Sequence, residues 1–152
     1  LSFGFSNGLN SYFTEIADYV TDFCLKEERK LWLEPRYYNN MNVKSSLVVQ
    51  ATYTDEMYES IDLGIVRPGI GTLTNLIAAR SKIICVHEEN NEEMLSNSRR
   101  INDLGFGINA PNIEALAKLL KNSDTVPRIK LKRAQDEFDG ETESFKVIEA
   151  IG

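Results

Sequence analysis

Short apolar runs alternate with longer amphipathic segments along most of this chain. The runs predict strands, and the segments between them repeat apolar residues at the 3.6-residue spacing of a helix. Strands that alternate with helices at this spacing build right-handed βαβ units. We therefore predict an α/β fold, a Rossmann-like, doubly wound parallel sheet of about six strands flanked by helices. The predicted strands cover residues 1–5, 30–34, 46–50, 63–66, 82–86 and 106–108.

The predicted helices carry start and stop signals. Asn10 is placed to cap the first helix, whose apolar face spans residues 13–24. Thr54 is placed to cap a short helix, and another helix begins behind Gly71. Residues 36–44 read as a polar and aromatic loop. A further helix is expected over 92–104, ending at Gly105, and another from Pro111 onward. Two more helical stretches are expected beyond Val126, separated near Gly140.

The turn after the fourth predicted strand is the most informative feature for function. The strand breaks at Arg67-Pro68-Gly69, and a helical pattern begins behind Gly71 and Thr72. A strand that runs through a glycine-rich turn into a helix leaves backbone N–H groups unpaired beside the positive end of the helix dipole, where a phosphate can bind. Arg67 would add a cation and Thr72 a hydroxyl. The alternative is an ordinary βα turn in which the glycines permit tight packing.

A second glycine turn follows the first predicted strand, at residues 4–8. Ligands of such folds bind beyond the carboxyl ends of the strands, where the strand order reverses. With the strand order 3-2-1-4-5-6, the first and fourth strands are neighbours, and the two glycine turns face each other across this crevice. That coincidence favours the phosphate interpretation over the packing interpretation.

Composition and charge argue against several classes of function. The net charge is −6 and there is no basic stripe, so a nucleic-acid partner is not expected. One histidine and two cysteines, each cysteine in an apolar pattern, argue against a metal site or a disulfide. No apolar run approaches the length of a transmembrane segment, and we expect a cytoplasmic location.

Neither glycine turn fits the better-known nucleotide motifs. A Walker loop ends in Gly-Lys-Ser or Gly-Lys-Thr, and this chain has no such triplet. The stretch 69–74 lacks the third glycine of the dinucleotide fingerprint and follows the fourth predicted strand, not the first. NAD and FAD are therefore not expected as cofactors.

Four short motifs occur in an order that resembles a known family. They are Gly4-Phe5-Ser6-Asn7-Gly8, Asp55-Glu56-Met57, Arg67-Pro68-Gly69-Ile70-Gly71-Thr72 and the stretch 97–105. Together they resemble the C-terminal, donor-binding half of GT-B glycosyltransferases. The closest likeness is to the family-28 group, which includes the peptidoglycan N-acetylglucosaminyltransferase and the diacylglycerol glycosyltransferases. The resemblance runs from about Gly4 to Leu120.

This resemblance implies a site for a UDP-sugar, which is a substrate, with no resident cofactor and no bound metal. It places the diphosphate between the two glycine turns. Two positions depart from the family pattern: Asn75 stands where the family has a glutamate for the ribose hydroxyls, and Met94 where it has a glutamine beside the sugar. The implied residues are Ser6, Asn7, Gly8, Arg67, Gly69, Gly71 and Thr72 for the diphosphate, Tyr53, Thr54 and Asn75 for the base and ribose, and Glu93 and Asn97 for the sugar.

The chain is expected to be a single nucleotide-sugar-binding domain over residues 1–152, the C-terminal piece of a two-domain protein. Acceptor recognition and the catalytic base are expected on an N-terminal domain or a partner subunit, so the chain alone should bind nucleotide without catalysis. No catalytic residue is assigned, and His87 reads as a loop residue near the sugar. Two alternatives stay open: a nucleotide-sugar hydrolase or epimerase of related architecture, and a non-catalytic module with a decayed pocket. Peripheral membrane association of the full-length protein also stays open.

Overall fold

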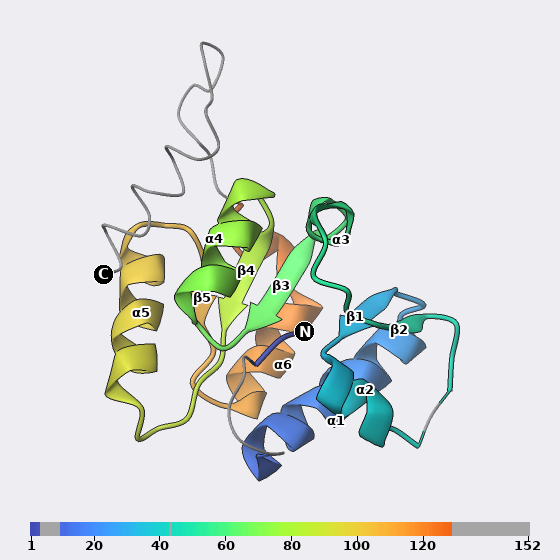
Figure 1. The fold of residues 1–152 in the computed structure, drawn as a ribbon. Coiled ribbons are helices and arrows are strands. Elements are labelled where there is room, and N and C mark those ends of the chain that lie inside the picture. The colour runs from blue at the N-terminus through green and yellow to red at the C-terminus, as the bar shows by residue number, and fades with distance from the viewer. Residues whose placement is uncertain (4–9, 43, 129–152) are drawn as a thin grey trace.

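The computed structural model describes residues 1–3, 10–42 and 44–128 (Figure 1). The first glycine turn and the helices predicted around Gly140 lie outside these residues. The elements are α1 Ser11–Lys26, β1 Leu31–Leu33, α2 Pro35–Asn40, β2 Val48–Gln50, α3 Asp55–Glu59, β3 Leu63–Val66, α4 Ile70–Ala78, β4 Lys82–Cys85, α5 Glu92–Asp103, β5 Ile108–Asn109, α6 Ile113–Lys121 and the 3₁₀ helix η1 Ser123–Thr125. Within the described ranges, no helix is both long enough and apolar enough to span a membrane.

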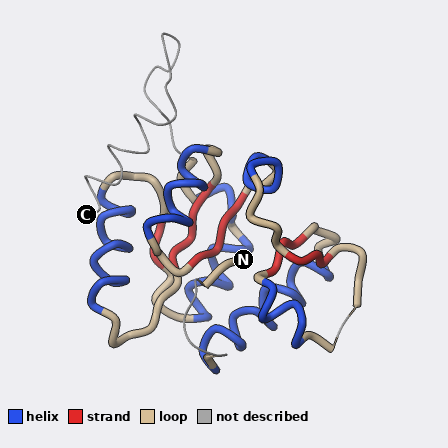
Figure 2. Tube along the Cα trace, viewed as in Figure 1, coloured by secondary structure: helices blue, strands red, loops and turns tan. Residues whose placement is uncertain are grey.

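The strands are parallel and form two small sheets. β1 pairs with β2, and β3, β4 and β5 form the second sheet with β4 in the middle. An α/β fold with flanking helices is confirmed (Figure 2), but the prediction of one sheet of about six strands is wrong. The two sheets are separate because the first segment (residues 1–3), which lies between β1 and β3, makes too few ladder contacts to count as a strand that joins them. Ser2, in the first predicted strand, contributes a single isolated bridge to Val66.

The first three residues lie between the two sheets and are hydrogen-bonded to both. Ser2 N donates to Ile65 O on the β3 side, at 3.1 Å. Glu34 N, at the end of β1, donates to Leu1 O, also at 3.1 Å. The first segment is therefore the lateral neighbour of β3, as the sequence argument about the two glycine turns requires.

The side chains of β3 and β4 alternate between two apolar clusters, one on each face of the sheet. Ile65 and Ile84 pack into a cluster with side chains of α1 and α6. Val66 and Ile83 pack into the other cluster, with side chains of α3, α4 and α5. This two-residue period is what a strand buried on both faces requires. Helices consequently cover both faces of the three-stranded sheet (Figure 1).

Several local predictions are confirmed. Asn10 caps α1, since its side-chain oxygen accepts from Tyr12 N at 2.8 Å. Thr54 caps α3 by accepting from Met57 N at 3.3 Å. Gly105 follows α5 with a φ of +70°, the left-handed conformation that favours glycine at a helix end. Both cysteines are buried, as their apolar patterns predicted.

Four local predictions need correction. The helix expected behind Gly71 and Thr72 begins earlier, at Ile70, because Gly69 serves as its N-cap, and Gly71 and Thr72 therefore lie in its first turn. Residues 35–40 form helix α2 where a loop was predicted, because Pro35 occupies the first helical turn, where its fixed φ and missing N–H suit a helix start. The helix predicted from Pro111 is capped by Asn112 and begins after it. The last strand lies at Ile108–Asn109, later than the sequence pattern indicated.

Candidate functional site

A cavity of about 530 Å³ opens where several strands give way to their connecting turns. Ser2 borders it from the first segment, Glu34 directly after β1, Arg67 directly after β3, and Tyr53 shortly after β2. The cavity thus lies at the carboxyl ends of parallel strands, the edge at which ligands bind in α/β folds. Its walls are formed by Ser2, Glu34, Tyr53, Tyr58, Arg67, Gly69, Ile70, Gly71, Thr72, Asn75, Glu93 and Met94.

Most of the predicted site residues that the structure describes border this one cavity. Thr54 and Asn97 do not border it, and residues 6–8 lie outside the described ranges. That the two glycine turns face each other therefore stays a prediction. Ser2, which comes just before the first turn in the sequence, does border the cavity. The predicted residues that come together are Tyr53, Arg67, Gly69, Gly71, Thr72, Asn75 and Glu93.

The first turn of α4 brings unpaired backbone N–H groups to the cavity. Gly69 is the N-cap and has no side chain to offer, and the helical hydrogen bonds begin with Leu73 N donating to Gly69 O at 3.0 Å. The N–H groups of Ile70, Gly71 and Thr72 precede this bond, and no described residue accepts from them. All three residues border the cavity, so these amides and the positive end of the helix dipole are available to an anion.

The glycines of this turn do not serve tight packing. Among the described residues, a Cβ atom on Gly71 would meet no atom within 4 Å, and one on Gly69 would meet only the Arg67 carbonyl oxygen, at 4.0 Å. The opposite holds at Gly64 in β3, where a Cβ would lie 2.5 Å from a methyl carbon of Leu76. As far as the described residues are concerned, the packing interpretation does not hold for Gly69 and Gly71, because no described neighbour packs against the place of a missing side chain.

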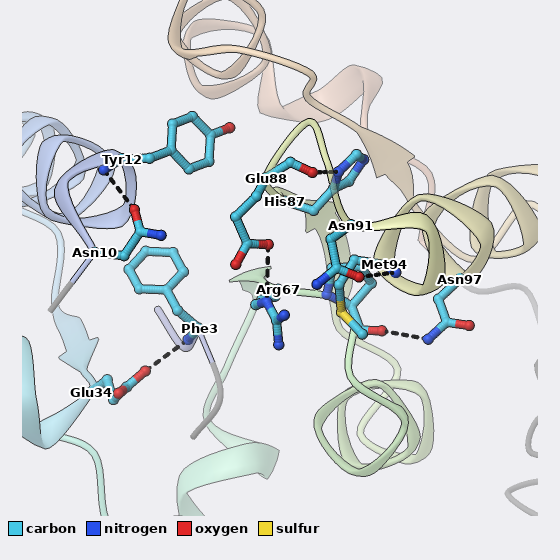
Figure 3. A network of polar contacts seen from close by, with 11 residues as sticks. Phe3, Asn10, Tyr12, Glu34, Arg67, His87, Glu88, Asn91, Met94 and Asn97 are labelled. Carbon is cyan, nitrogen blue, oxygen red and sulfur yellow. Dashed lines mark hydrogen bonds and ion pairs between the residues drawn. The ribbon is translucent and has the colours of Figure 1, made fainter. Parts of the chain in front are cut away.

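Arg67 brings a positive charge to the cavity wall. Its Nε donates to Glu88 Oε2 at 3.1 Å, and the other guanidinium nitrogens are directed away from that carboxylate (Figure 3). Pro68, the residue after Arg67, is held as well. Asn97 Nδ2 donates to the Pro68 carbonyl oxygen at 3.0 Å in the protein interior, and Figure 3 draws this bond from Asn97. Asn97 thereby supports the β3–α4 turn, and its predicted contact with a sugar stays a prediction.

Tyr53 forms part of the wall in an unusual backbone conformation. Its φ is +55°, a value uncommon outside glycine. Its N–H donates to Met57 Sδ at 3.4 Å, and its hydroxyl lies 3.5 Å from Ser2 Oγ. Partial burial raises the pKa of the Tyr53 hydroxyl above the ordinary tyrosine value, so this hydroxyl stays protonated and able to donate at neutral pH, as in any tyrosine. The hydroxyl of Thr54, by contrast, is committed to capping α3.

Both departures from the family pattern lie in the cavity wall. Asn75 is exposed on α4, one turn beyond Gly71, and Met94 is buried in the first turn of α5 beside the exposed Glu93. An amide combines an acceptor oxygen with two donor hydrogens, so Asn75 can still pair with a diol, but without a charge. A thioether has no donor, and Met94 offers a ligand mainly apolar contact.

Sequence reasoning missed Glu34, a carboxylate in the cavity wall that is only 4% exposed. Its Oε2 accepts from Phe3 N at 2.8 Å, and its Oε1 accepts from Arg36 Nε at 2.6 Å. In a regular parallel ladder Phe3 N would bond to a main-chain carbonyl. The main-chain carbonyl that would accept is that of Glu34, but it accepts from Tyr38 N of α2 instead. The Glu34 side chain replaces this carbonyl as the acceptor for Phe3 N. The available signal was a lone carboxylate between a strand and Pro35.

The side-chain charges around the cavity are nearly balanced. Arg67 is paired with Glu88 and Arg36 with Glu34, and Glu93 adds a further carboxylate to the wall. The summed side-chain charge therefore gives an anion little attraction from a distance. Attraction must come from donors at hydrogen-bond range, where partial exclusion of water makes each contact stronger.

His87 follows β4 but does not border the cavity. Its Nδ1 lies 3.0 Å from the Glu88 carbonyl oxygen, which can only accept, so Nδ1 carries the proton. Its Nε2 is buried and has no partner among the described residues. This placement suits a structural loop residue better than a catalytic base.

A second cavity, of about 400 Å³, lies near the amino ends of β1 and β3. Side chains of α1, β1 and α3 make most of its wall apolar. It shares Ser2, Tyr53, Tyr58 and Thr72 with the first cavity, but Arg67 and the first two residues of α4 do not border it. We therefore place the candidate site in the first cavity.

No protein-family model matches this chain, and no curated protein matches it. In the part of the chain that the structure describes, no group of three or more His, Cys, Asp or Glu side chains is arranged to hold a metal ion. The candidate site is accordingly defined by its own geometry: an oriented arginine, helix amides that no described residue accepts from and glycines that no described residue packs against, around one cavity.

Proposed function

We propose that this chain is the donor-binding domain of a glycosyltransferase and that the cavity binds the diphosphate of a UDP-sugar. One observation carries the proposal: the free amides at the start of α4, the open glycines and Arg67 meet at a single cavity beyond the carboxyl ends of parallel strands. The position of the first segment beside β3 is compatible with the Rossmann-like donor domain that the sequence motifs resemble.

The proposed binding mode uses each element of the wall. The α4 amides donate to phosphate oxygens, and the terminal nitrogens of Arg67 add a charged contact. Tyr53, Asn75 and Glu93 border the same cavity. In the proposed mode, Tyr53 and Asn75 contact the base and ribose, and Glu93 contacts the donor sugar. Preorganised donors of this kind stabilise a departing diphosphate without requiring a metal.

In the proposed reaction, an acceptor hydroxyl attacks the anomeric carbon of the sugar while the bond from that carbon to the diphosphate oxygen breaks. UDP leaves with the electron pair of the broken bond, and the hydroxyl proton passes to a base. This chain supplies the stabilisation of the leaving diphosphate. The base and the acceptor site belong to an N-terminal domain or a partner subunit, so the isolated chain binds UDP and does not turn it over.

Calorimetric titration of the chain with UDP tests this proposal. We expect a dissociation constant between about 1 µM and 1 mM, which corresponds to roughly 8 to 4 kcal/mol of binding free energy. Arg67→Ala should weaken binding about tenfold or more, since it removes a charged donor. Arg100→Ala is the control, because Arg100 is an exposed residue of α5 that does not border the cavity. A wild-type chain that shows no binding at millimolar UDP contradicts the proposal.

One observation favours a second candidate, a related activity or a non-catalytic module. Asn75 and Met94 both border the cavity, so the departures from the family pattern fall where they alter a ligand's contacts. A titration panel of UDP, ADP, GDP and dTDP separates an altered nucleotide preference from a decayed pocket, which would bind none of them. Product analysis on the full-length protein separates a transferase, which yields a glycosylated acceptor, from a hydrolase, which yields free sugar.

A further inference from the structure

The ion pair between Arg67 and Glu88 joins the β3–α4 turn to the segment between β4 and α5. Arg67 exposes 19% of its side chain and Glu88 exposes 26%, so the pair is largely shielded from water. Arg67 borders the cavity and Glu88 does not. The carboxylate therefore approaches the guanidinium from outside the cavity.

The pair uses the inner nitrogen of the guanidinium. Arginine presents five N–H donors in one rigid plane. Nε donates to Glu88 Oε2 at 3.1 Å, which fixes the plane, and the two terminal nitrogens are directed away from Glu88 (Figure 3). A carboxylate that blocked an anion site would grip the terminal nitrogens, since phosphate also prefers that two-point contact. Here Arg67 is oriented by Glu88, and its terminal nitrogens are not blocked by it.

We propose that Glu88 is a positioning residue, which holds the Arg67 guanidinium so that its terminal nitrogens are presented to an anionic ligand in the cavity. The inference deepens the proposed function and rests on it, because the ligand meant is the nucleoside diphosphate. Glu88 itself touches no ligand and acts only through Arg67.

Asn97 adds to this arrangement through the backbone. Its Nδ2 holds Pro68 O at 3.0 Å, one residue after Arg67. Side chain and backbone are thus both fixed before a ligand arrives. Fixing a long, flexible arginine in advance lowers the conformational entropy that binding would otherwise cost.

Two substitutions of Glu88 distinguish two possible effects on UDP affinity: the orientation of Arg67 by Glu88, and the negative charge of Glu88 itself. Glu88→Ala removes the acceptor for Nε, and we expect UDP binding to weaken about tenfold, even though a negative charge is lost. Glu88→Gln keeps an oxygen that can accept from Nε, and we expect affinity within about twofold of wild type. Glu89→Gln is the control, because Glu89 is exposed and next in sequence, and it should leave the affinity unchanged.

Two outcomes of this titration overturn the proposal. If Glu88→Ala and Glu88→Gln both tighten UDP binding by the same factor, Glu88 is a competing charge. If neither substitution changes the affinity, the orientation of Arg67 has no bearing on binding.

A measurement without ligand distinguishes this inference from the proposed function. In NMR spectra of the free protein, the Arg67 Nε–H should exchange slowly with water in wild type and in Glu88→Gln, and rapidly in Glu88→Ala. Equal exchange rates in all three proteins overturn the positioning role. If the exchange pattern is as expected but wild type does not bind UDP, the proposed function fails, whereas the orientation of Arg67 by Glu88 stands.

Discussion

At the scale of single residues, the proposed ligand site depends on the absence of a side chain at Gly71, in the first turn of α4. Glycine within a helix costs about 0.5–1 kcal/mol relative to alanine. Gly71 carries this cost although a Cβ atom would fit without meeting any described atom within 4 Å. Neither a positive φ nor close packing accounts for this glycine. The proposed binding of a ligand to the α4 amides would account for it, because a side chain here would stand beside the cavity.

Gly71→Ala should therefore change stability and binding in opposite directions. We expect the free energy of unfolding to rise by about 0.5–1 kcal/mol, because alanine favours the helix. We expect UDP binding to weaken about fivefold, because the methyl group narrows the approach to the amides. Urea denaturation and calorimetric titration of the same variant measure the two effects.

Gly64→Ala is the matched control for this prediction. Its Cβ would lie 2.5 Å from a methyl carbon of Leu76, so we expect a loss of about 1–3 kcal/mol of unfolding free energy from overpacking. If Gly71→Ala binds UDP as tightly as the wild type, the open glycine has no role in ligand access.

Single residues also mark where sequence reasoning ended. Arg67 and Gly71 could be predicted as site residues because a strand, a glycine turn and a helix start carry a local signature. Glu34 could not, because a glutamate that replaces a main-chain carbonyl in a ladder looks, in sequence, like any surface glutamate. Its role depends on Phe3 N, which lies 31 positions away in the chain.

At the scale of elements, periodicity and capping residues predicted most helices. α1 and α5 both have long amphipathic patterns, and both form as expected. Asn10 marks the start of α1, and Gly105 marks the end of α5. α2 was missed because Pro35 signals the end of a strand as readily as the start of a helix. The continuity of the sheet was overestimated because apolar runs show where strands lie but not how many ladder bonds each one makes.

At the junction between α5 and the β3–α4 turn, Asn97 Nδ2 donates to Pro68 O at 3.0 Å. Asn97→Ala should leave the Pro68 carbonyl without its donor, and we expect a loss of about 1–3 kcal/mol of unfolding free energy. It should also speed hydrogen exchange at the backbone amides of residues 69–72, because the turn is less firmly held. Asn102→Ala, at an exposed position of the same helix, is the control. Unchanged exchange at the turn would show that Asn97 does not support it.

At the scale of the whole molecule, charge and site must be considered together. The net charge is −6, so the overall field does not attract a diphosphate. In the proposed mode, binding rests on the α4 amides and Arg67 at close range, and such contacts are screened little by salt. Affinity for UDP should therefore depend weakly on ionic strength, unlike the strong dependence of nucleic-acid binders.

The cavity draws on segments that are far apart in the sequence. Three of its residues follow strands β1, β2 and β3, namely Glu34, Tyr53 and Arg67, and Ser2 lies in the segment beside β3. Parallel topology brings the carboxyl ends of these strands to the same edge. The edge of the molecule that holds the cavity was therefore predictable from alternating strands and helices. The lining of the cavity was predictable only in part, because the side chains that border it depend on the loops between the elements.

Residue-resolved NMR of the isotope-labelled chain, titrated with UDP, tests the account most directly. We predict saturable shifts of the Ile70, Gly71 and Thr72 backbone amides, with a single dissociation constant between about 1 µM and 1 mM. Shifts confined to the second cavity, around Trp32 and Met57, or no saturable shift at millimolar UDP, would contradict the account.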